Sequence, residues 1–482
     1  MNFKWLVIVT AAAGLALIQN ASAAGDSKSV IDSAQKAMGN LKTVEYSGSG
    51  ADFVLGQAFS PSSPWPRFID KTYTRSINFE QPASHMHRAR TQGENPPHGG
   101  GLQPVIGERP EDQVIVVSGN TPWAQQLEIV MLPQGFLNAA AKANATVKSQ
   151  SMGGKKYQVV TFMGDNKAPV MGYIDDRNLV EKVQTKIDSN MYGDLPWEAE
   201  YSDYKSVNGV QFPMHIVHRQ GGFPVLDLNV SDVKVNGPVS IQAASTPPPP
   251  APTVGSKKLA DGVYLITGGY ASLAVDFKDY IVVIEGPQSE ARGIAVIDES
   301  KRAIPNKPIK YVINTHDHID HSSGLRPFVA EGATIVTHAI NKPYFEKIWK
   351  DPHSLNPDRM AMSKKKPVFE TMTEKKVMTD GTRTIELYHV TGSIHNEGMI
   401  MAWLPKEGIL VEADEFNPPP QPPTATPNPI HPYHPHFAEL LDSLKIDPQT
   451  IVPIHLPPDG RTVRKAELLL MAGKRAQVAQ VK

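Results

Sequence analysis

The sequence predicts an α/β layered domain in the C-terminal part of the chain, preceded by a mainly antiparallel α+β domain. Two patterns within the 482 residues predict this division. After residue 255, strand-like and helix-like runs alternate, which is typical of α/β layered domains. Before residue 240, short strand-like runs are separated by Gly, Asn and Asp, which is typical of hairpins in an antiparallel sheet. A chain of this length also exceeds what one ordinary core organises.

A proline-rich stretch separates the two parts. Residues 241–254 contain "ASTPPPPAPTV", and consecutive prolines favour an extended polyproline conformation. We therefore expect a linker at 241–254 between an N-terminal domain at 25–240 and a C-terminal domain at 255–482.

The N-terminal domain is predicted to open with a helix at 29–41. Strand-like segments follow at 44–56, 112–119, 156–163, 168–175, 179–187, 210–220 and 225–236. The C-terminal domain is predicted to have helices at 289–304, 324–332 and 436–445. Its expected strands are 262–268, 271–277, 280–286, 309–315, 333–338, 382–391, 399–405, 408–414 and 450–455. The proline-rich segment 417–436 is expected to be a long loop.

The first 23 residues resemble a secretory signal peptide. Lys4 precedes the short apolar run "WLVIVTAAAGLALI", and "ASA" at 21–23 has the small residues of a cleavage site. The run is shorter than the roughly 20 residues that span a bilayer. We expect a periplasmic or secreted protein with no integral membrane segment after cleavage; an uncleaved membrane anchor is the alternative.

Composition excludes several classes of site. The chain has no cysteine, which excludes disulfides, thiolate metal ligands and a cysteine nucleophile. The net charge of −1 predicts no nucleic-acid partner. The expected partner is therefore a small-molecule substrate, and the sequence leaves the oligomeric state open.

A dense cluster of metal-binding side chains follows the strand expected at 309–315. His316, His318, Asp320 and His321 form the pattern H-x-H-x-D-H. A helix does not bring these spacings onto one face, whereas a loop at a strand end can turn all four side chains inward. Imidazole and carboxylate groups are ligands suited to zinc and similar divalent ions.

Three further polar residues each end an apolar strand or follow one closely. They are His395, Asp414 and His455. With the cluster they supply seven ligands, which suffices for two ions with three terminal ligands each and one shared carboxylate. Glu412, two residues before Asp414 on the same strand, is the one rival for the shared position.

Other histidines have weaker patterns. His85 and His87 have H-x-H spacing without a partner cluster and are interpreted as solvent-facing strand residues. His431, His434 and His436 lie in the proline-rich loop, where they are polar loop residues, substrate contacts or ligands of a third metal.

The H-x-H-x-D-H pattern with its three distant partners resembles the metallo-β-lactamase superfamily over residues 255–482. The resemblance implies an αββα sandwich. It implies that His316, His318 and His395 hold one zinc ion, that Asp320, His321 and His455 hold a second, and that Asp414 bridges them. Because the bridging position is an aspartate, the chain resembles the glyoxalase-II-like branch.

The function expected from this resemblance is hydrolysis of an ester, thioester or lactone by a metal-bridging hydroxide. Asp320 is the expected catalytic residue, because a ligand carboxylate can also orient the nucleophile and accept its proton. A β-lactamase is the first alternative. The second is lipid or apolar-ligand binding by the N-terminal domain, with the metal domain accessory. A redox role, with iron bound, ranks below these.

Overall fold

The structure is a computed structural model that describes residues 20–101, 104–242 and 253–474. The expected signal peptide lies largely outside these residues, and the described chain begins with helix α1 at Asn20. Most of the expected linker, residues 243–252, is likewise outside the described residues. No helix of the described residues is long and apolar enough to cross a membrane.

An eleven-stranded antiparallel sheet forms the N-terminal domain, in the order β4-β3-β2-β1-β13-β12-β9-β8-β7-β6-β5. Its strands are β1 (Thr43–Phe53), β2 (Arg67–Asn78), β3 (Ala83–Gln92), β4 (Arg109–Val116), β5 (Thr146–Met152), β6 (Lys155–Met163), β7 (Pro169–Ile174), β8 (Val180–Ser189), β9 (Gly193–Ser202), β12 (His215–Gln220) and β13 (Phe223–Val235). A small hairpin of β10 (Lys205–Val207) and β11 (Val210–Phe212) stands apart.

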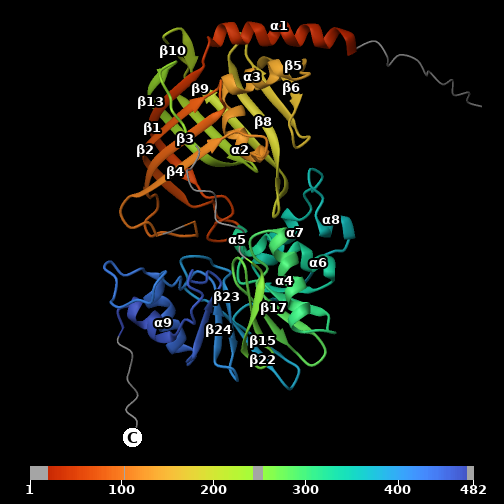
Figure 1. Ribbon diagram of the computed structural model, residues 1–482, viewed down its shortest axis with the longest axis vertical. Helices are drawn as coiled ribbons and strands as arrows, with labels where there is room; N and C mark the ends of the chain where they lie inside the picture. The colour runs from red at the N-terminus through yellow and green to blue at the C-terminus, as the bar shows by residue number, and fades with distance from the viewer. Residues whose placement is uncertain (1–19, 102–103, 243–252, 475–482) are drawn as a thin grey trace, which may run out of the picture.

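Three helices pack against this sheet. They are α1 (Asn20–Met38), α2 (Trp123–Val130) and α3 (Pro133–Lys142), and α1 lies across the top of the domain in Figure 1. Leu127 and Phe136 from these helices are fully buried with Val160 and Val183 of the sheet. The helices therefore fill the inner face of the sheet and give the domain its own hydrophobic core.

Two mixed sheets form the C-terminal domain. The first has the order β14-β15-β16-β17-β18-β19-β20, and the second has the order β21-β22-β23-β24-β25. The strands are β14 (Gly255–Ala260), β15 (Val263–Thr267), β16 (Ser272–Asp276), β17 (Ile281–Ile284), β18 (Ile309–Ile313), β19 (Thr334–His338), β20 (Val368–Met372), β21 (Lys375–Thr379), β22 (Thr384–His389), β23 (Ile400–Leu404), β24 (Ile409–Glu412) and β25 (Thr450–Pro453).

Helices cover the outer face of each sheet. The helices are α4 (Glu290–Ala303), α5 (Ile319–Ser322), α6 (Arg326–Glu331), α7 (Asn341–Ile348), α8 (Arg359–Ser363), α9 (Tyr433–Ser443) and α10 (Lys465–Met471). The two sheets bury a common core between them, to which Val282 and Leu387 contribute. Val296 of α4 packs in a second core outside one sheet, and Phe437 of α9 packs in a third core outside the other. These four layers confirm the expected αββα sandwich (Figure 1).

The two domains contact each other directly through side chains and backbone. The Tyr192 and Tyr344 hydroxyls lie 2.8 Å apart. The Asp194 carboxylate accepts the backbone N–H groups of Ser354, at 2.8 Å, and of Leu355, at 3.0 Å, and also the Ser354 hydroxyl. A buried carboxylate with three donors anchors the segment that follows α7 to the end of the N-terminal sheet.

Asp194 gives this anchor a defined pH dependence. Burial acts to raise its pKa, but the hydrogen bonds from Leu355 and Ser354 outweigh burial and lower the pKa below its ordinary value. A carboxyl group with a lowered folded-state pKa stabilises the fold above its unfolded pKa of about 3.9, and this contribution is lost as the pH falls through the folded value.

We expect Asp194→Asn to lower the free energy of unfolding by about 1–2 kcal/mol at pH 7, because a charge-assisted acceptor becomes a neutral one. The difference between variant and wild type should be smaller at pH 3 than at pH 7, because part of this contribution is lost once the pH falls below the unfolded pKa of about 3.9. Denaturant unfolding of both proteins at the two pH values measures this. An equal difference at both values would contradict the assignment.

Candidate metal centre

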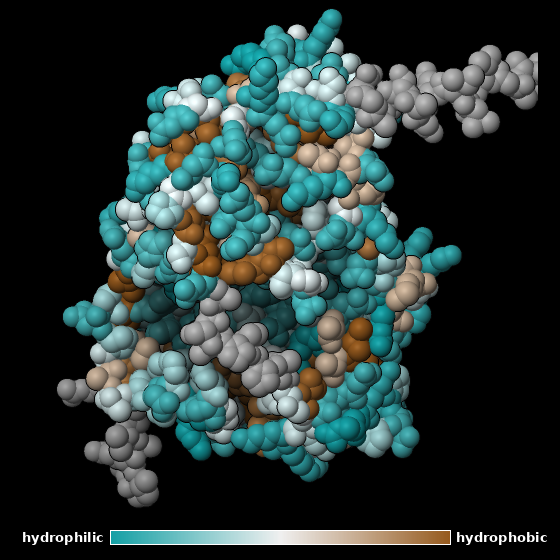
Figure 2. Space-filling model, turned by 45° about the horizontal axis from the view of Figure 1, so that its top comes forward, coloured by the Kyte–Doolittle hydropathy of each residue, from teal (hydrophilic) through white to brown (hydrophobic). Residues whose placement is uncertain are grey.

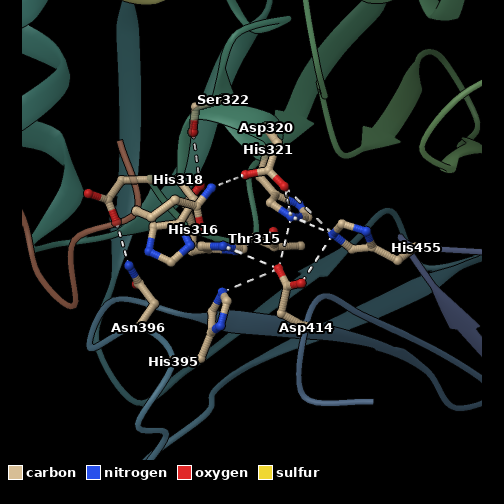
Figure 3. Close-up of polar contacts among 12 residues, drawn as sticks. Thr315, His316, His318, Asp320, His321, Ser322, His395, Asn396, Asp414 and His455 are labelled. Atoms are coloured by element: carbon tan, nitrogen blue, oxygen red, sulfur yellow. Dashed lines mark hydrogen bonds and ion pairs between the residues drawn. The ribbon is translucent and has the colours of Figure 1, made fainter. Parts of the chain in front are cut away.

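The seven residues expected as ligands lie together at one end of the two sheets. His316 and His318 lie in the loop after β18, and Asp320 and His321 lie in the single turn of α5. The other three come from the second sheet: His395 lies between β22 and β23, Asp414 follows β24, and His455 follows β25. Figure 3 shows these side chains converging from both sheets. The centre therefore depends on the packing of one sheet upon the other.

The first group comprises His316, His318 and His395. All three are buried, and their candidate ligand nitrogens lie within 4.8 Å of one another. The nitrogens that lack a hydrogen-bond partner are Nε2 of His316, Nδ1 of His318 and Nε2 of His395. An unsatisfied buried polar atom costs roughly 1–3 kcal/mol. Three such atoms facing one another are the arrangement that a cation would satisfy.

The second group comprises Asp320, His321 and His455, whose ligand atoms also lie within 4.8 Å of one another. Nε2 of His321 is 3.1 Å from Nε2 of His455. The Oδ2 atom of Asp320 is 3.5 Å from the former nitrogen and 3.7 Å from the latter. This group is more open than the first, because the side chains of Asp320 and His455 are 28% and 24% exposed.

Asp414 lies between the two groups. Its Oδ2 atom is 3.3 Å from Nε2 of His395 in the first group and 2.9 Å from Nε2 of His321 in the second. Its Oδ1 atom is 3.1 Å from Nε2 of His455. Asp414 also has a φ of +65°, a left-handed conformation that is unfavourable for a non-glycine residue. The strained turn directs the carboxylate to a position shared by both groups.

Glu412, the rival for this position, points elsewhere. It is fully buried, and its carboxylate accepts the backbone N–H of Phe416 at 3.1 Å. Burial raises its pKa well above the ordinary value, which favours the neutral acid. Among the described residues it belongs to none of the groups that can hold a metal ion.

The pKa values of the histidines shift in opposite directions in the two groups. Burial, reinforced by the neighbouring His321, lowers the pKa of His316 well below its ordinary value, and burial lowers that of His318 to about 3. Both imidazoles are thus neutral at pH 7, the form that binds metal ions. Burial also acts to lower the pKa of His321, but the carboxylates of Asp320 and Asp414 raise it overall.

A network of buried side chains holds the motif loop in place. The hydroxyl of Thr315 donates to Glu285, which also lies 3.4 Å from Nδ1 of His321. The backbone carbonyl of His316 accepts hydrogen bonds from Asn314 at 2.7 Å and from Ser322 at 2.9 Å. Carboxylates and carbonyls that hold the second ring nitrogen of a histidine orient it as a ligand.

Sequence reasoning missed two side chains of this centre, Glu285 and Gln57. Glu285 follows β17 and is completely buried with a φ of +78°, and its place at a strand end was the one available signal. Gln57 belongs to the N-terminal domain, and its amide donates to Asp320 at 2.7 Å. No local sequence pattern links Gln57 to Asp320, because the two residues are 263 positions apart.

The remaining histidines have other surroundings. His85 and His87 lie on β3, half exposed, and both bond Asp112, which the sequence interpretation did not foresee. His431 lies with its ring 4.6 Å from that of Tyr433, whose ring is 5.6 Å from His395. The proline-rich loop therefore packs beside the centre. The expectation that the loop extends to residue 436 is wrong at its end, because His434 and His436 lie in helix α9. Among the described residues, none of these three histidines belongs to a further group of three ligands.

The donor set fits divalent metal ions. Buried neutral imidazoles and shared carboxylates are the ligands used by zinc and related ions. The unpartnered nitrogens of the first group and the carboxylate common to both groups are observations of this structure that agree with such binding.

Comparisons with known proteins agree with this reading of the fold. Residues 271–455 match the family described as the metallo-β-lactamase superfamily. No curated protein sequence matches the chain.

Solved structures resemble this chain only distantly. The metallo-β-lactamase from Pontibacter korlensis is 16% identical, with a TM-score of 0.36, and the match covers 46% of this chain and 98% of that one. The metallo-β-lactamase from Hirschia baltica is 18% identical, with a TM-score of 0.34, covering 46% and 96%.

A rubredoxin oxygen:oxidoreductase from Desulfovibrio gigas is 15% identical, with a TM-score of 0.34. The match covers 45% of this chain and 61% of the Desulfovibrio protein. The αββα layers of the C-terminal domain agree with the match of residues 271–455 to the metallo-β-lactamase superfamily.

Proposed function

We propose that the protein is a hydrolase of esters, thioesters or lactones that works with two zinc ions, in the manner of the glyoxalase-II-like branch. One observation carries the proposal: three buried nitrogens without hydrogen-bond partners belong to one group of candidate ligands, a second ligand group lies beside it, and Asp414 contacts both. In this proposal His316, His318 and His395 hold one ion, Asp320, His321 and His455 hold the other, and Asp414 is shared.

When bound, two divalent cations would lower the pKa of a bound water and polarise a substrate carbonyl. The chain's own residues supply orientation and proton transfer. Asp320 is the partly exposed carboxylate of the centre and accepts the proton of the attacking water. His316 and His321 are completely buried, so substrate approaches from the side of Asp320 and His455.

An apolar pocket beside the motif supports a substrate with an apolar group. The pocket has a volume of about 680 Å³ and lies where the two domains meet. Its walls include Trp65 and Phe223 of the N-terminal domain, and Ile340, Tyr344 and Asp317 of the C-terminal domain. This volume falls in the range of small-molecule sites. Figure 2 shows the molecule hollowed between its upper and lower parts, with hydrophobic residues on the upper rim.

We also propose that the protein is exported to the periplasm or secreted, because its first residues resemble a signal peptide. The mature chain would begin near Ala24, which sequencing of the purified protein's N-terminus tests. A purified protein whose N-terminal residue is Met1 would contradict the proposed export. It would not affect the hydrolase proposal.

We expect the zinc-loaded protein to hydrolyse an aryl ester, a lactone or a thioester, and a chelator to abolish this turnover. Initial rates on these substrates and on a β-lactam, with matched metal analysis, measure it. Turnover of the β-lactam alone would favour the β-lactamase alternative. Iron in place of zinc, with no hydrolysis, would favour a redox role and contradict the proposal.

We expect His318→Ala to lose most of its bound metal and to lower turnover by more than roughly 100-fold. Loss of a residue that only orients a ligand commonly lowers metal affinity or activity by roughly 10–100-fold, and loss of the ligand itself should have a larger effect. Elemental analysis and initial rates measure both effects. His87→Ala is the matched control, since it alters an H-x-H pattern at an exposed position of β3 and should change neither quantity. Full activity in His318→Ala would refute the ligand assignment.

We expect Trp65→Ala to raise the KM for esters with long alkyl or aromatic groups by about tenfold, because it removes apolar contact area. The KM for short-chain esters and the kcat for both classes should stay within about twofold of wild type. A KM increase of equal size for short and long substrates would show that the pocket does not select the apolar group.

A further inference from the structure

Two loops of the N-terminal domain lie directly on the metal centre. The loop between β1 and β2 contacts the motif through its backbone: the Gly56 carbonyl accepts the N–H of Ile319 at 3.0 Å, and the Ala58 carbonyl accepts Nε2–H of His318 at 2.8 Å. The loop after β3 makes a further backbone hydrogen bond, from Gly99 to the carbonyl of Ile394 at 2.9 Å. These contacts bring a second domain to the residues next to the ligands.

From this geometry we infer that the N-terminal domain completes the metal centre and that Gln57 is the positioning residue for Asp320. The inference rests on the proposed two-metal site but concerns a residue outside the superfamily domain. The Nε2 atom of Gln57 donates to Oδ1 of Asp320 at 2.7 Å. Gln57 is only 8% exposed, so little solvent competes for this bond.

The amide of Gln57 is held in one orientation. Its Oε1 atom accepts the backbone N–H of Gly101 at 3.0 Å, which leaves the NH₂ group to face Asp320. The backbone carbonyl of Gln57 also accepts the N–H of Gly100 at 2.9 Å. Both ends of the residue are therefore fixed by the loop after β3.

This bond distinguishes the two oxygens of Asp320. Oδ1 is occupied by Gln57, whereas Oδ2 faces His321 at 3.5 Å and His455 at 3.7 Å. Gln57 thus keeps Oδ2 directed into the second group and prevents rotation of the carboxylate. Hydrogen bonds of this kind to a ligand commonly change metal affinity by roughly 10–100-fold.

The glycines of both loops show that the close approach is built into the fold. A Cβ atom at Gly100 would lie 2.8 Å from Cε1 of His318 and 2.0 Å from Oε1 of Gln57. A Cβ atom at Gly56 would lie 2.7 Å from Cβ of Ile319, and Gly56 also has a φ of +70°. No larger residue at these two positions leaves the loops where they are.

Cobalt(II) titration of the full-length metal-free protein tests the inference, with the visible absorption of bound cobalt as the readout. Gln57→Met keeps the length of the side chain and removes its amide, both the carbonyl oxygen and the NH₂ group. We expect it to weaken binding of the second cobalt ion by roughly 10–100-fold and to alter its absorption band. Binding of the first ion, held by His316, His318 and His395, should stay within about twofold.

Two further variants make the test specific. Gly100→Ala, whose added Cβ would meet both Oε1 of Gln57 and the ring of His318, should weaken binding of both ions, in contrast to Gln57→Met. Gln150→Met, on exposed β5, should behave as wild type. Thermal unfolding of each metal-free variant checks that the fold is kept.

The possible results separate the two proposals. Equal weakening of both ions in Gln57→Met, or no change in either, would overturn the positioning role. Wild-type protein that binds fewer than two cobalt ions would overturn both proposals. Selective loss in Gln57→Met, together with a wild type that binds two ions but hydrolyses no substrate, would support the positioning role and refute the proposed hydrolase activity.

Discussion

The arrangement of the metal centre depends on one constraint: a cluster of histidines and aspartates is buried with too few hydrogen-bond partners among the described residues. Six other candidate metal ligands lie around Asp414 in the two groups. Three of their nitrogens have no hydrogen-bond partner. Such a cluster opposes folding unless its surroundings hold it together. The strained turn at Asp414, the buried Glu285 and the hydrogen bonds to the carbonyl of His316 all serve that end.

The two domains contact each other next to these buried ligands. Backbone carbonyls of the loop after β1 accept from the motif residues, and glycines bring the second loop into contact with His318. The apolar pocket lies beside these loops and takes its walls from both domains. The N-terminal domain therefore contributes to the surroundings of the metal centre, although its sheet has a separate hydrophobic core.

The αββα domain could be predicted from the sequence because its central strands are continuous apolar runs, each followed by a polar residue at its end. The strands of the antiparallel sheet are harder to predict from the sequence. β5 is almost wholly exposed, and β2 buries Asp70 and Arg75 among its apolar residues, so hydrophobic alternation is weak in both. The contact of Gln57 with Asp320 had no sequence signal, because it depends on how two separately folded domains pack.

His318 shows what this packing means for the chemistry of the domain. Because its Nε2 atom donates to the Ala58 carbonyl, the proton of the neutral ring is kept on that nitrogen, and Nδ1 is left as the lone-pair donor. The tautomer of a ligand in one domain is thus chosen by the main chain of the other. A C-terminal domain transferred to a new fusion partner would need another acceptor at the position of this carbonyl to keep the same tautomer of His318.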